Sequence, residues 1–131
     1  MSYSFGARSK QRLVGVHPDI IKMLDLAISR SQIDFTVLEG LRTPARQREL
    51  FAAGATKTMN SRHLTGHAVD IAPVINGAVT FAWPPYYVLA GEVKAAALET
   101  GVPITWGGDW KTFKDGPHWE LPWAQYPLPK G

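Results

Sequence analysis

The chain has 131 residues, 45% of them hydrophobic and 19% charged, and a formal net charge of +3. This composition is that of an ordinary globular protein and excludes a disordered or fibrous chain. The length suits a single domain that spans residues 1–131. Cysteine is absent, which excludes disulfides and thiolate metal sites, so a bound metal would have to be held by His, Asp or Glu.

The charge pattern and the apolar pattern limit the partners of the chain. Its basic residues are scattered and form no Lys/Arg block, so we expect no nucleic-acid partner. No apolar run approaches the roughly 20 residues of a membrane span, and residues 1–8 lack the apolar core of a signal peptide. We therefore expect a monomer that is made in the cytoplasm and does not insert stably into a membrane.

The first elements can be read from local signals. Residues 1–16 are predicted to be irregular or weakly paired. A helix is predicted from Pro18 to about Ser31, because proline suits the first helical position and Asp19 faces the positive end of the helix dipole. Its apolar residues recur at helical spacing: Ile20, Leu24, Ala27 and Ile28. Residues 35–38 are strand-like.

The middle of the chain is predicted to contain a helix, a loop and a hairpin. Thr43-Pro44 favours a helix start, and Gly54 is a plausible stop. Residues 55–66 are loop-like, and 68–72 read as a short strand. Asn76-Gly77 between two apolar segments is a strong hairpin signal.

The last third is predicted to hold one more helix and two strands. The helix starts at Pro84-Pro85 and ends at Gly101. Residues 104–106 and 118–121 are strand candidates, and an extended tail follows from residue 122. Since helices and strands do not alternate in a βαβ rhythm, the expected class is α+β, with an antiparallel sheet packed against about three helices.

A set of possible metal ligands stands out. His63, Asp70 and His118 supply two imidazoles and one carboxylate, and Asp115 precedes His118 by three residues. Three N/O ligands leave a fourth position open for water, as in a catalytic zinc site. Asp115 could then handle the proton of that water.

The chain has four histidines, and not all of them suit this site. His17 stands at a helix start, where capping explains it. If His67 and Asp70 share a strand, their side chains face opposite sides, because side chains alternate along a strand. His63 in the preceding loop can fold back over the face of Asp70, and Gly66 would permit the tight return.

Other interpretations remain open from the residues alone. Asp115-Gly116 could be only a turn, and Arg42 could be an exposed side chain. Glu120 is a rival base, because two residues apart on a strand it shares a face with His118. Ser61 is expected to form a local hydrogen bond, since no Ser–His–acid set surrounds it.

The candidate ligands belong to a longer pattern: Ser61-x-His63-x-x-Gly66-x-Ala68-x-Asp70, followed by Asp115-x-x-His118. This pattern resembles the zinc peptidases that include D-alanyl-D-alanine carboxypeptidases and dipeptidases. It is most similar to their phage branch, the L-alanyl-D-glutamate peptidase endolysins. The similarity extends through residues 40–44 with Gln47, 106–110 and 117–121.

The resemblance implies roles for individual residues. His63, Asp70 and His118 would hold one zinc ion per chain, Asp115 would be the acid/base, and Arg42 would support charge on the substrate or transition state. Many relatives have Glu in place of Asp115. Residues expected next to the ligands or along the substrate cleft are Ser61, Gln47, Glu120, Trp106, Asp109 and Trp110.

The resemblance also implies a fold and an activity. The fold would be like that of Hedgehog and D,D-peptidase domains, and residues 1–131 would form one catalytic domain without a wall-binding module. The expected activity is hydrolysis of the L-Ala–D-Glu bond of peptidoglycan by an endolysin, which reaches the wall once the membrane is permeabilised. The alternatives are a D-Ala-D-Ala carboxypeptidase and a non-catalytic zinc- or wall-binding module.

Overall fold

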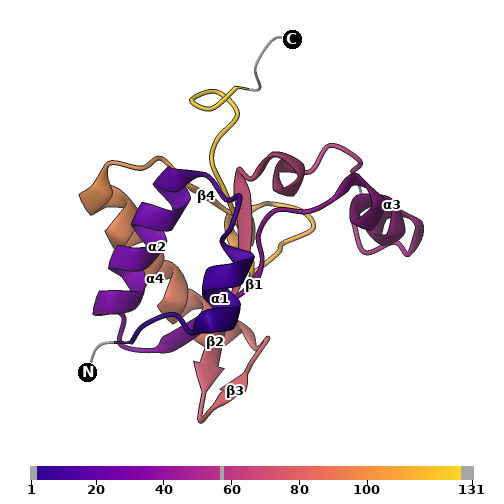
Figure 1. Ribbon diagram of the computed structural model, residues 1–131. Helices are drawn as coiled ribbons and strands as arrows, with labels where there is room; N and C mark the ends of the chain where they lie inside the picture. The colour runs from indigo at the N-terminus through magenta and orange to yellow at the C-terminus, as the bar shows by residue number, and fades with distance from the viewer. Residues whose placement is uncertain (1–2, 57, 128–131) are drawn as a thin grey trace.

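An antiparallel sheet of five strands lies at the centre of the computed structural model, which describes residues 3–56 and 58–127 (Figure 1). Four strands follow the order β1-β2-β5-β4, and β3 pairs with β2. Their bounds are β1 Asp34–Glu39, β2 Ala68–Ile75, β3 Ala78–Val79, β4 Thr105–Trp106 and β5 His118–Glu120. Strand β2 is therefore central, with β1 on one side and β5 on the other.

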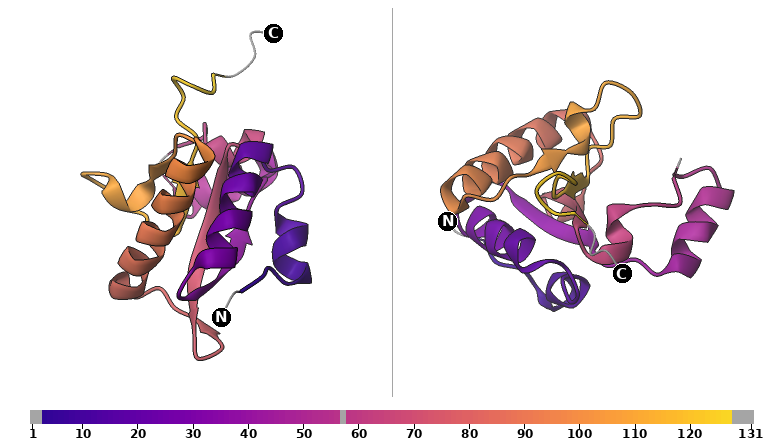
Figure 2. Two further views of the ribbon diagram at one scale, coloured as in Figure 1. Left: turned by 90° about the vertical axis from the view of Figure 1, so that its left-hand side faces the viewer. Right: turned by 90° about the horizontal axis from the view of Figure 1, so that it is seen from above.

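Two helices cover one side of this sheet. Helices α2 (Pro18–Arg30) and α4 (Trp83–Thr100) lie side by side there, whereas α3 (Pro44–Ala52) stands on the opposite side (Figure 1, Figure 2). The main core lies between the sheet and the helix pair, and its fully buried side chains include Ile20, Met23, Leu24, Ile71, Leu89 and Val93. This arrangement agrees with the predicted α+β class.

The helix boundaries follow the local signals. His17 Nδ1 accepts a hydrogen bond from the Asp19 N–H at 3.0 Å, which caps α2 and confirms the interpretation of that histidine. Thr43 Oγ1 caps α3 in the same way, and α4 ends before Gly101. Among the helices of the described residues, none is both long and apolar enough to cross a membrane.

The predicted hairpin is present between β2 and β3. Asn76 and Gly77 have φ angles of 51° and 79°, which are the left-handed values that a tight two-residue turn requires. Val74 then pairs with Val79 across the hairpin.

The prediction of an irregular N-terminal segment is wrong for helix α1 (Ala7–Arg12). This short helix lies along the edge strand β1 and bonds to it. Ser9 Oγ lies 2.9 Å from Thr36 Oγ1 and accepts from the Val37 N–H at 3.1 Å, while Arg12 Nη1 donates to the Val37 carbonyl at 2.9 Å. These tertiary bonds stabilise a helix that has little local signal.

Two other segments differ from the expectations. The predicted loop 55–66 contains a 3₁₀ helix, η1 (Arg62–Thr65), and another, η2 (Gly107–Asp109), follows β4. The predicted extended tail instead forms a turn, in which the Tyr126 N–H donates to the Pro122 carbonyl at 3.0 Å. The buried Arg62 guanidinium holds this turn, since it donates to the Tyr126 carbonyl at 2.8 Å. Residues 128–131 lie outside the described residues.

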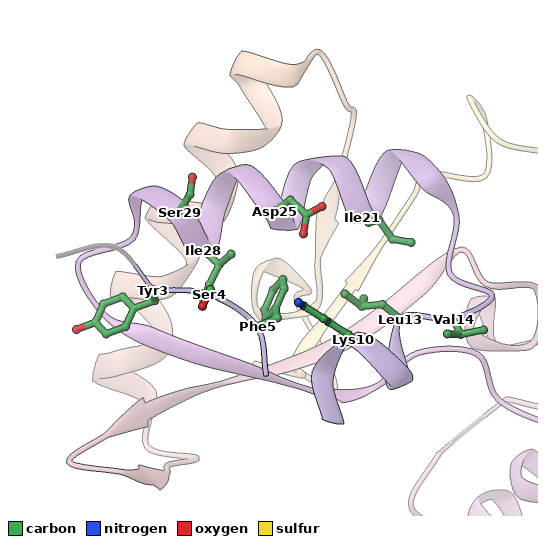
Figure 3. Close-up of a pocket in the computed structure, with 10 residues that line it drawn as sticks. All are labelled: Tyr3, Ser4, Phe5, Lys10, Leu13, Val14, Ile21, Asp25, Ile28 and Ser29. Atoms are coloured by element: carbon green, nitrogen blue, oxygen red, sulfur yellow. The ribbon is translucent and has the colours of Figure 1, made fainter. Parts of the chain in front are cut away.

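A mostly apolar hollow of about 530 Å³ lies between the N-terminal segment, α1 and α2 (Figure 3). Phe5, Leu13 and Ile28 contribute apolar surface, and Lys10 and Asp25 contribute opposite charges. All of its lining residues lie within residues 3–29, so it is separate from the histidine-containing cleft, whose lining begins at Glu39.

Candidate metal centre

His63, Asp70 and His118 converge from three elements. Asp70 on β2 and His118 on β5 are direct cross-strand partners, which places their side chains next to each other on one face of the sheet. His63 comes from η1, which ends at Gly66 in a left-handed conformation with a φ of 78°. A Cβ at Gly66 would collide with the Gly15 carbonyl, so glycine permits the turn that returns His63 over Asp70.

The donor atoms of this group have separations that fit a zinc ion. His63 Nε2 lies 3.2 Å from Asp70 Oδ1, and His118 Nδ1 lies 3.3 Å from the same oxygen. Two ligand atoms at about 2.0–2.1 Å from a tetrahedral zinc lie about 3.3–3.4 Å apart. All three residues offer donors within 4.8 Å of one another. The chemistry and spacing of the donor set are therefore compatible with zinc.

The outer nitrogens of both imidazoles are held by acceptors. His63 Nδ1 lies 2.8 Å from the Gly40 carbonyl, and His118 Nε2 lies 2.7 Å from Glu120 Oε1. Such bonds fix the ring orientation and leave the opposite nitrogen for a metal, and a carboxylate partner also makes the imidazole more basic. Nε2 of His63 and Nδ1 of His118 are thus the nitrogens that face Asp70.

The electrostatics of the group reflect the proximity of these charges. Burial alone would raise the pKa of the Asp70 carboxyl, but hydrogen bonds with His118 and His63 outweigh burial and hold that pKa well below its usual range. Burial also lowers the pKa of His118, whereas bonds to Asp70 and Glu120 raise it to a net value of about 9. This raised pKa favours the protonated imidazole, so a metal ion that bound His118 Nδ1 would have to displace a proton.

Arg42 lies beside the metal-ligand group and is itself held in place. Its Nε donates to Glu39, its Nη1 donates to Gln47 Oε1 at 2.8 Å, and its Nη2 lies 3.8 Å from Asp70 Oδ2. Gln47 is fully buried and also donates to the Thr58 carbonyl at 2.6 Å. The Arg42 side chain is only 9% exposed, and these partners fix the direction of its guanidinium.

Asp115 lies at the start of the turn that leads into β5. Its N–H donates to the Gly107 carbonyl at 3.1 Å, and its carbonyl accepts from the His118 N–H at 3.3 Å. Burial, followed by the nearby negative charge of Asp70, raises the pKa of the Asp115 carboxyl. A raised pKa makes this carboxylate a better proton acceptor than an exposed aspartate.

A single cleft of about 1050 Å³ connects these groups. It is lined by the ligand set together with Arg42 and Asp115, and its walls come from α3 and the residues after it, the segment 110–115, and Trp123. The cleft is large enough to hold a short peptide segment across the ligand group.

The sequence matches the family model of the phage L-alanyl-D-glutamate peptidases over residues 1–121. The chain belongs to this family. It is 32% identical to the L-alanyl-D-glutamate peptidase of Escherichia phage T5, over 88% of this chain and 87% of that protein. It is 34% identical to the peptidoglycan L-alanyl-D-glutamate endopeptidase CwlK of Bacillus subtilis, over 81% and 73% of the two chains.

Two further similar proteins show how much of the chain the similarity covers. The L-alanyl-D-glutamate peptidase of Listeria phage A118 is 34% identical over 80% of this chain, which spans only 36% of that longer protein. The crystal structure of the Serratia marcescens L-Ala D-Glu endopeptidase ChiX superposes with a TM-score of 0.90, 48% identity and 95% coverage of both chains. The family resemblance and the fold predicted from sequence are therefore confirmed.

The contacts of Ser61, His67 and Glu120 show where these other residues from the sequence analysis lie relative to the ligand group. Ser61 Oγ accepts from the His63 N–H at 3.1 Å and caps η1. His67 faces away from the ligand group: its Nδ1 lies 2.7 Å from Thr65 Oγ1, and its ring packs 5.4 Å from that of His17. Glu120 orients His118, as described above.

Trp106 and Asp109 were expected beside the ligands or along the cleft, and neither is among the residues that line the cleft. Trp106 is buried, its ring stacks on Trp119 at 5.7 Å, and its Nε1 donates a 2.7 Å hydrogen bond to the Gly116 carbonyl, next to Asp115. Asp109 points outward and pairs with Lys94 at 2.7 Å. Trp110 does line the cleft, with its ring 5.2 Å from that of His118.

Among the residues that line the cleft without a role in the sequence analysis, Glu39 and Trp123 have specific contacts. Glu39 pairs with Arg42 and is the register partner of Asp70 across β1 and β2. In the sequence, the only indication of this pairing is that Glu39 is an acidic residue three positions before Arg42. Trp123 lies over the Arg62 guanidinium at 4.0 Å and lines the cleft, a contact for which the sequence offers no spacing signal.

Proposed function

We propose that this protein is a zinc-dependent peptidoglycan peptidase that hydrolyses the L-Ala–D-Glu bond of the murein stem peptide. Its family and the names of its relatives support the substrate and the bond. The observation that carries the proposal is the ligand group His63, Asp70 and His118, whose cleft is also lined by Arg42 and Asp115. A wall-binding module without catalysis would not need these last two side chains there.

The three ligand residues would hold one zinc ion through His63 Nε2, the Asp70 carboxylate and His118 Nδ1. Bound zinc supplies Lewis-acid activation of water and of the scissile carbonyl. The protein supplies the orientation: the Gly40 carbonyl fixes the ring of His63, and Glu120 fixes that of His118.

We assign proton transfer to Asp115. Its carboxylate accepts a proton from the attacking water and delivers it to the amine that leaves with D-Glu, so that one water yields a carboxylate and an amine. Glu120 is the alternative base. It is already hydrogen-bonded to His118 at 2.7 Å, so we assign to it the orientation of that imidazole.

We assign stabilisation of negative charge to Arg42. Its guanidinium stays protonated at any working pH and presents several N–H donors in a fixed plane. The bonds to Glu39 and Gln47 hold this plane at the edge of the cleft. The arginine can then bind the oxygen on which charge develops as the carbonyl carbon becomes tetrahedral.

The biological setting that we propose is phage-induced lysis. Relatives from phages T5 and A118 carry the L-alanyl-D-glutamate peptidase name. In this setting the protein accumulates in the host cytoplasm as a monomeric catalytic domain and reaches its peptidoglycan substrate after the membrane is permeabilised.

Digestion of purified murein tests the proposal, with mass spectrometry of the new termini. The expected product carries a new N-terminal D-Glu. Released D-Ala would instead identify a D,D-carboxypeptidase, and no product would identify a binding module. A chelator should abolish the digestion, and one equivalent of zinc per chain should restore it.

A further inference from the structure

One buried hydroxyl in the first turns of α4 has no hydrogen-bond partner. Within the described part of the chain, two buried side-chain polar atoms are unpaired, Arg62 Nη1 and Tyr86 Oη. Arg62 still bonds through its other nitrogens to the carbonyls of Leu121 and Tyr126, whereas the hydroxyl is the only polar group of the Tyr86 side chain. Leaving such a group unpaired costs about 1–3 kcal/mol, so its retention calls for a role.

Tyr86 lies directly beneath the turn that carries Asp115. The residue is 3% exposed, and a Cβ built on Gly116 would lie 3.3 Å from Tyr86 Cγ. The aromatic ring therefore supports the backbone immediately after Asp115. Trp83 and Tyr86 have ring centroids 6.3 Å apart, so the ring contacts the first residue of its own helix as well as the turn.

The charged groups that affect the pKa of this hydroxyl are two carboxylates. Burial, then the charges of Asp115 and Asp70, raise the pKa of Tyr86 to about 12. The hydroxyl therefore remains a protonated donor across the working pH range. Of the two carboxylates, Asp70 is already committed to His63, His118 and Arg42. The Asp115 carboxylate accepts no hydrogen bond from the residues that the structure describes.

Building on the proposed function, we propose that Tyr86 is a positioning residue for Asp115. In the substrate complex its hydroxyl donates a hydrogen bond to the Asp115 carboxylate, directly or through one water. Catalytic hydrogen bonds are often long before substrate binds and tighten in the reacting complex. This bond holds the carboxylate toward the attacking water and favours its ionised, proton-accepting form.

The Tyr86→Phe variant tests this inference, because it removes only the hydroxyl. We expect kcat on a defined stem peptide to fall roughly ten- to a hundredfold, as for loss of a hydrogen bond to a charged group. KM and zinc content should be unchanged, and Tm should not fall, since the lost hydroxyl was unpaired. Wild-type kcat would overturn the inference. A lower Tm with reduced zinc would also overturn it, because it would indicate a structural role.

Tyr87→Phe is the matched control. It makes the same change one residue along α4, at a side chain that is 57% exposed, and should behave as wild type in all four measurements. A kcat loss in this variant equal to that of Tyr86→Phe would assign the effect to the helix rather than to the Asp115 contact, and would contradict the inference.

Combination with Asp115→Asn separates this inference from the proposed function. If Tyr86 acts through Asp115, the double variant should be no slower than Asp115→Asn alone, whereas independent roles would multiply the two losses. An inactive Asp115→Asn with a fully active Tyr86→Phe would overturn the inference alone. A fully active Asp115→Asn would remove the proposed acid/base and the role of Tyr86 with it.

Discussion

Asp70 is the side chain at which the polar contacts of the proposed metal centre meet. Its Oδ1 faces both ligand histidines, its Oδ2 faces Arg42, and Glu39 is its register partner on β1. A change at any of these neighbours alters the charge around a proposed ligand. Variants of this site therefore need to be judged by metal content as well as by rate.

The two histidines near β2 give the first prediction. His63→Ala should lose stoichiometric zinc and murein hydrolysis, because it removes the nitrogen that lies 3.2 Å from Asp70. His67→Ala is the matched control and should keep both, because His67 contacts Thr65 and His17 instead. Metal analysis of the purified proteins checks this. Loss of zinc in His67→Ala alone would contradict the ligand assignment.

Arg42 gives the second prediction. Arg42→Lys should lower kcat/KM about a hundredfold, the usual order for loss of a donor to developing charge, because an ammonium cannot reproduce the planar guanidinium. Zinc content should be retained, since Arg42 is not a ligand. Arg46→Lys is the control, because that side chain is 54% exposed and should tolerate the change. Equal kinetics for all three proteins would remove Arg42 from the catalytic site.

At the scale of elements, the features predicted from sequence are those with local causes. Pro18 after a capping His17, Thr43 before Pro44, and Asn76-Gly77 each act within a few residues, and each marks the boundary or turn expected from it. The family motif adds the ligand candidates, because its spacing carries information about a shared fold.

The features that could not be predicted depend on contacts between distant segments. Helix α1 requires bonds to β1, and the turn 122–126 requires the Arg62 guanidinium. In the site, Glu39 reaches its place through a register shift between β1 and β2, and Tyr86 through packing under Gly116. A helical apolar pattern indicates that Tyr86 is buried, but not what its hydroxyl faces.

The dependence of α1 on β1 gives the third prediction. Ser9→Ala should lower the free energy of unfolding by about 1–3 kcal/mol, because the Val37 N–H loses its buried acceptor. Arg8→Ala on the exposed side of the same helix is the control and should have little effect. Urea denaturation measures both. Equal stability of the two variants would show that the bond contributes nothing to the attachment of α1.

At the scale of the whole molecule, the proposed metal centre joins parts of the chain that are distant in sequence. Its proposed ligands come from η1, β2 and β5. A bound ion would therefore connect η1, which precedes the central strand β2, to β5, the last strand along the chain. An ion that binds only the folded protein stabilises it by mass action. Zinc occupancy and global stability should therefore change together.

The pH dependence of this coupling gives the last prediction. Bonds to Asp70 and Glu120 raise the pKa of His118 from 6.5 to about 9. A raised folded-state pKa stabilises the zinc-free fold fully below about 6.5, and this contribution is lost as pH rises toward about 9. Zinc needs the unprotonated imidazole, so its binding strengthens over the same interval. The difference in Tm between zinc-loaded and zinc-free protein should therefore widen from pH 7 to pH 9.

Glu120→Gln provides the comparison for this prediction, because it removes one of the carboxylates that raise the pKa of His118. The Tm of its zinc-free form should depend less on pH between 7 and 9 than that of the wild type. Thermal unfolding after chelation, in buffers across this interval, measures the effect in both proteins. If the zinc-free wild type has a constant or rising Tm and matches Glu120→Gln, His118 does not carry the additional proton, and zinc binds without displacing one from that ring.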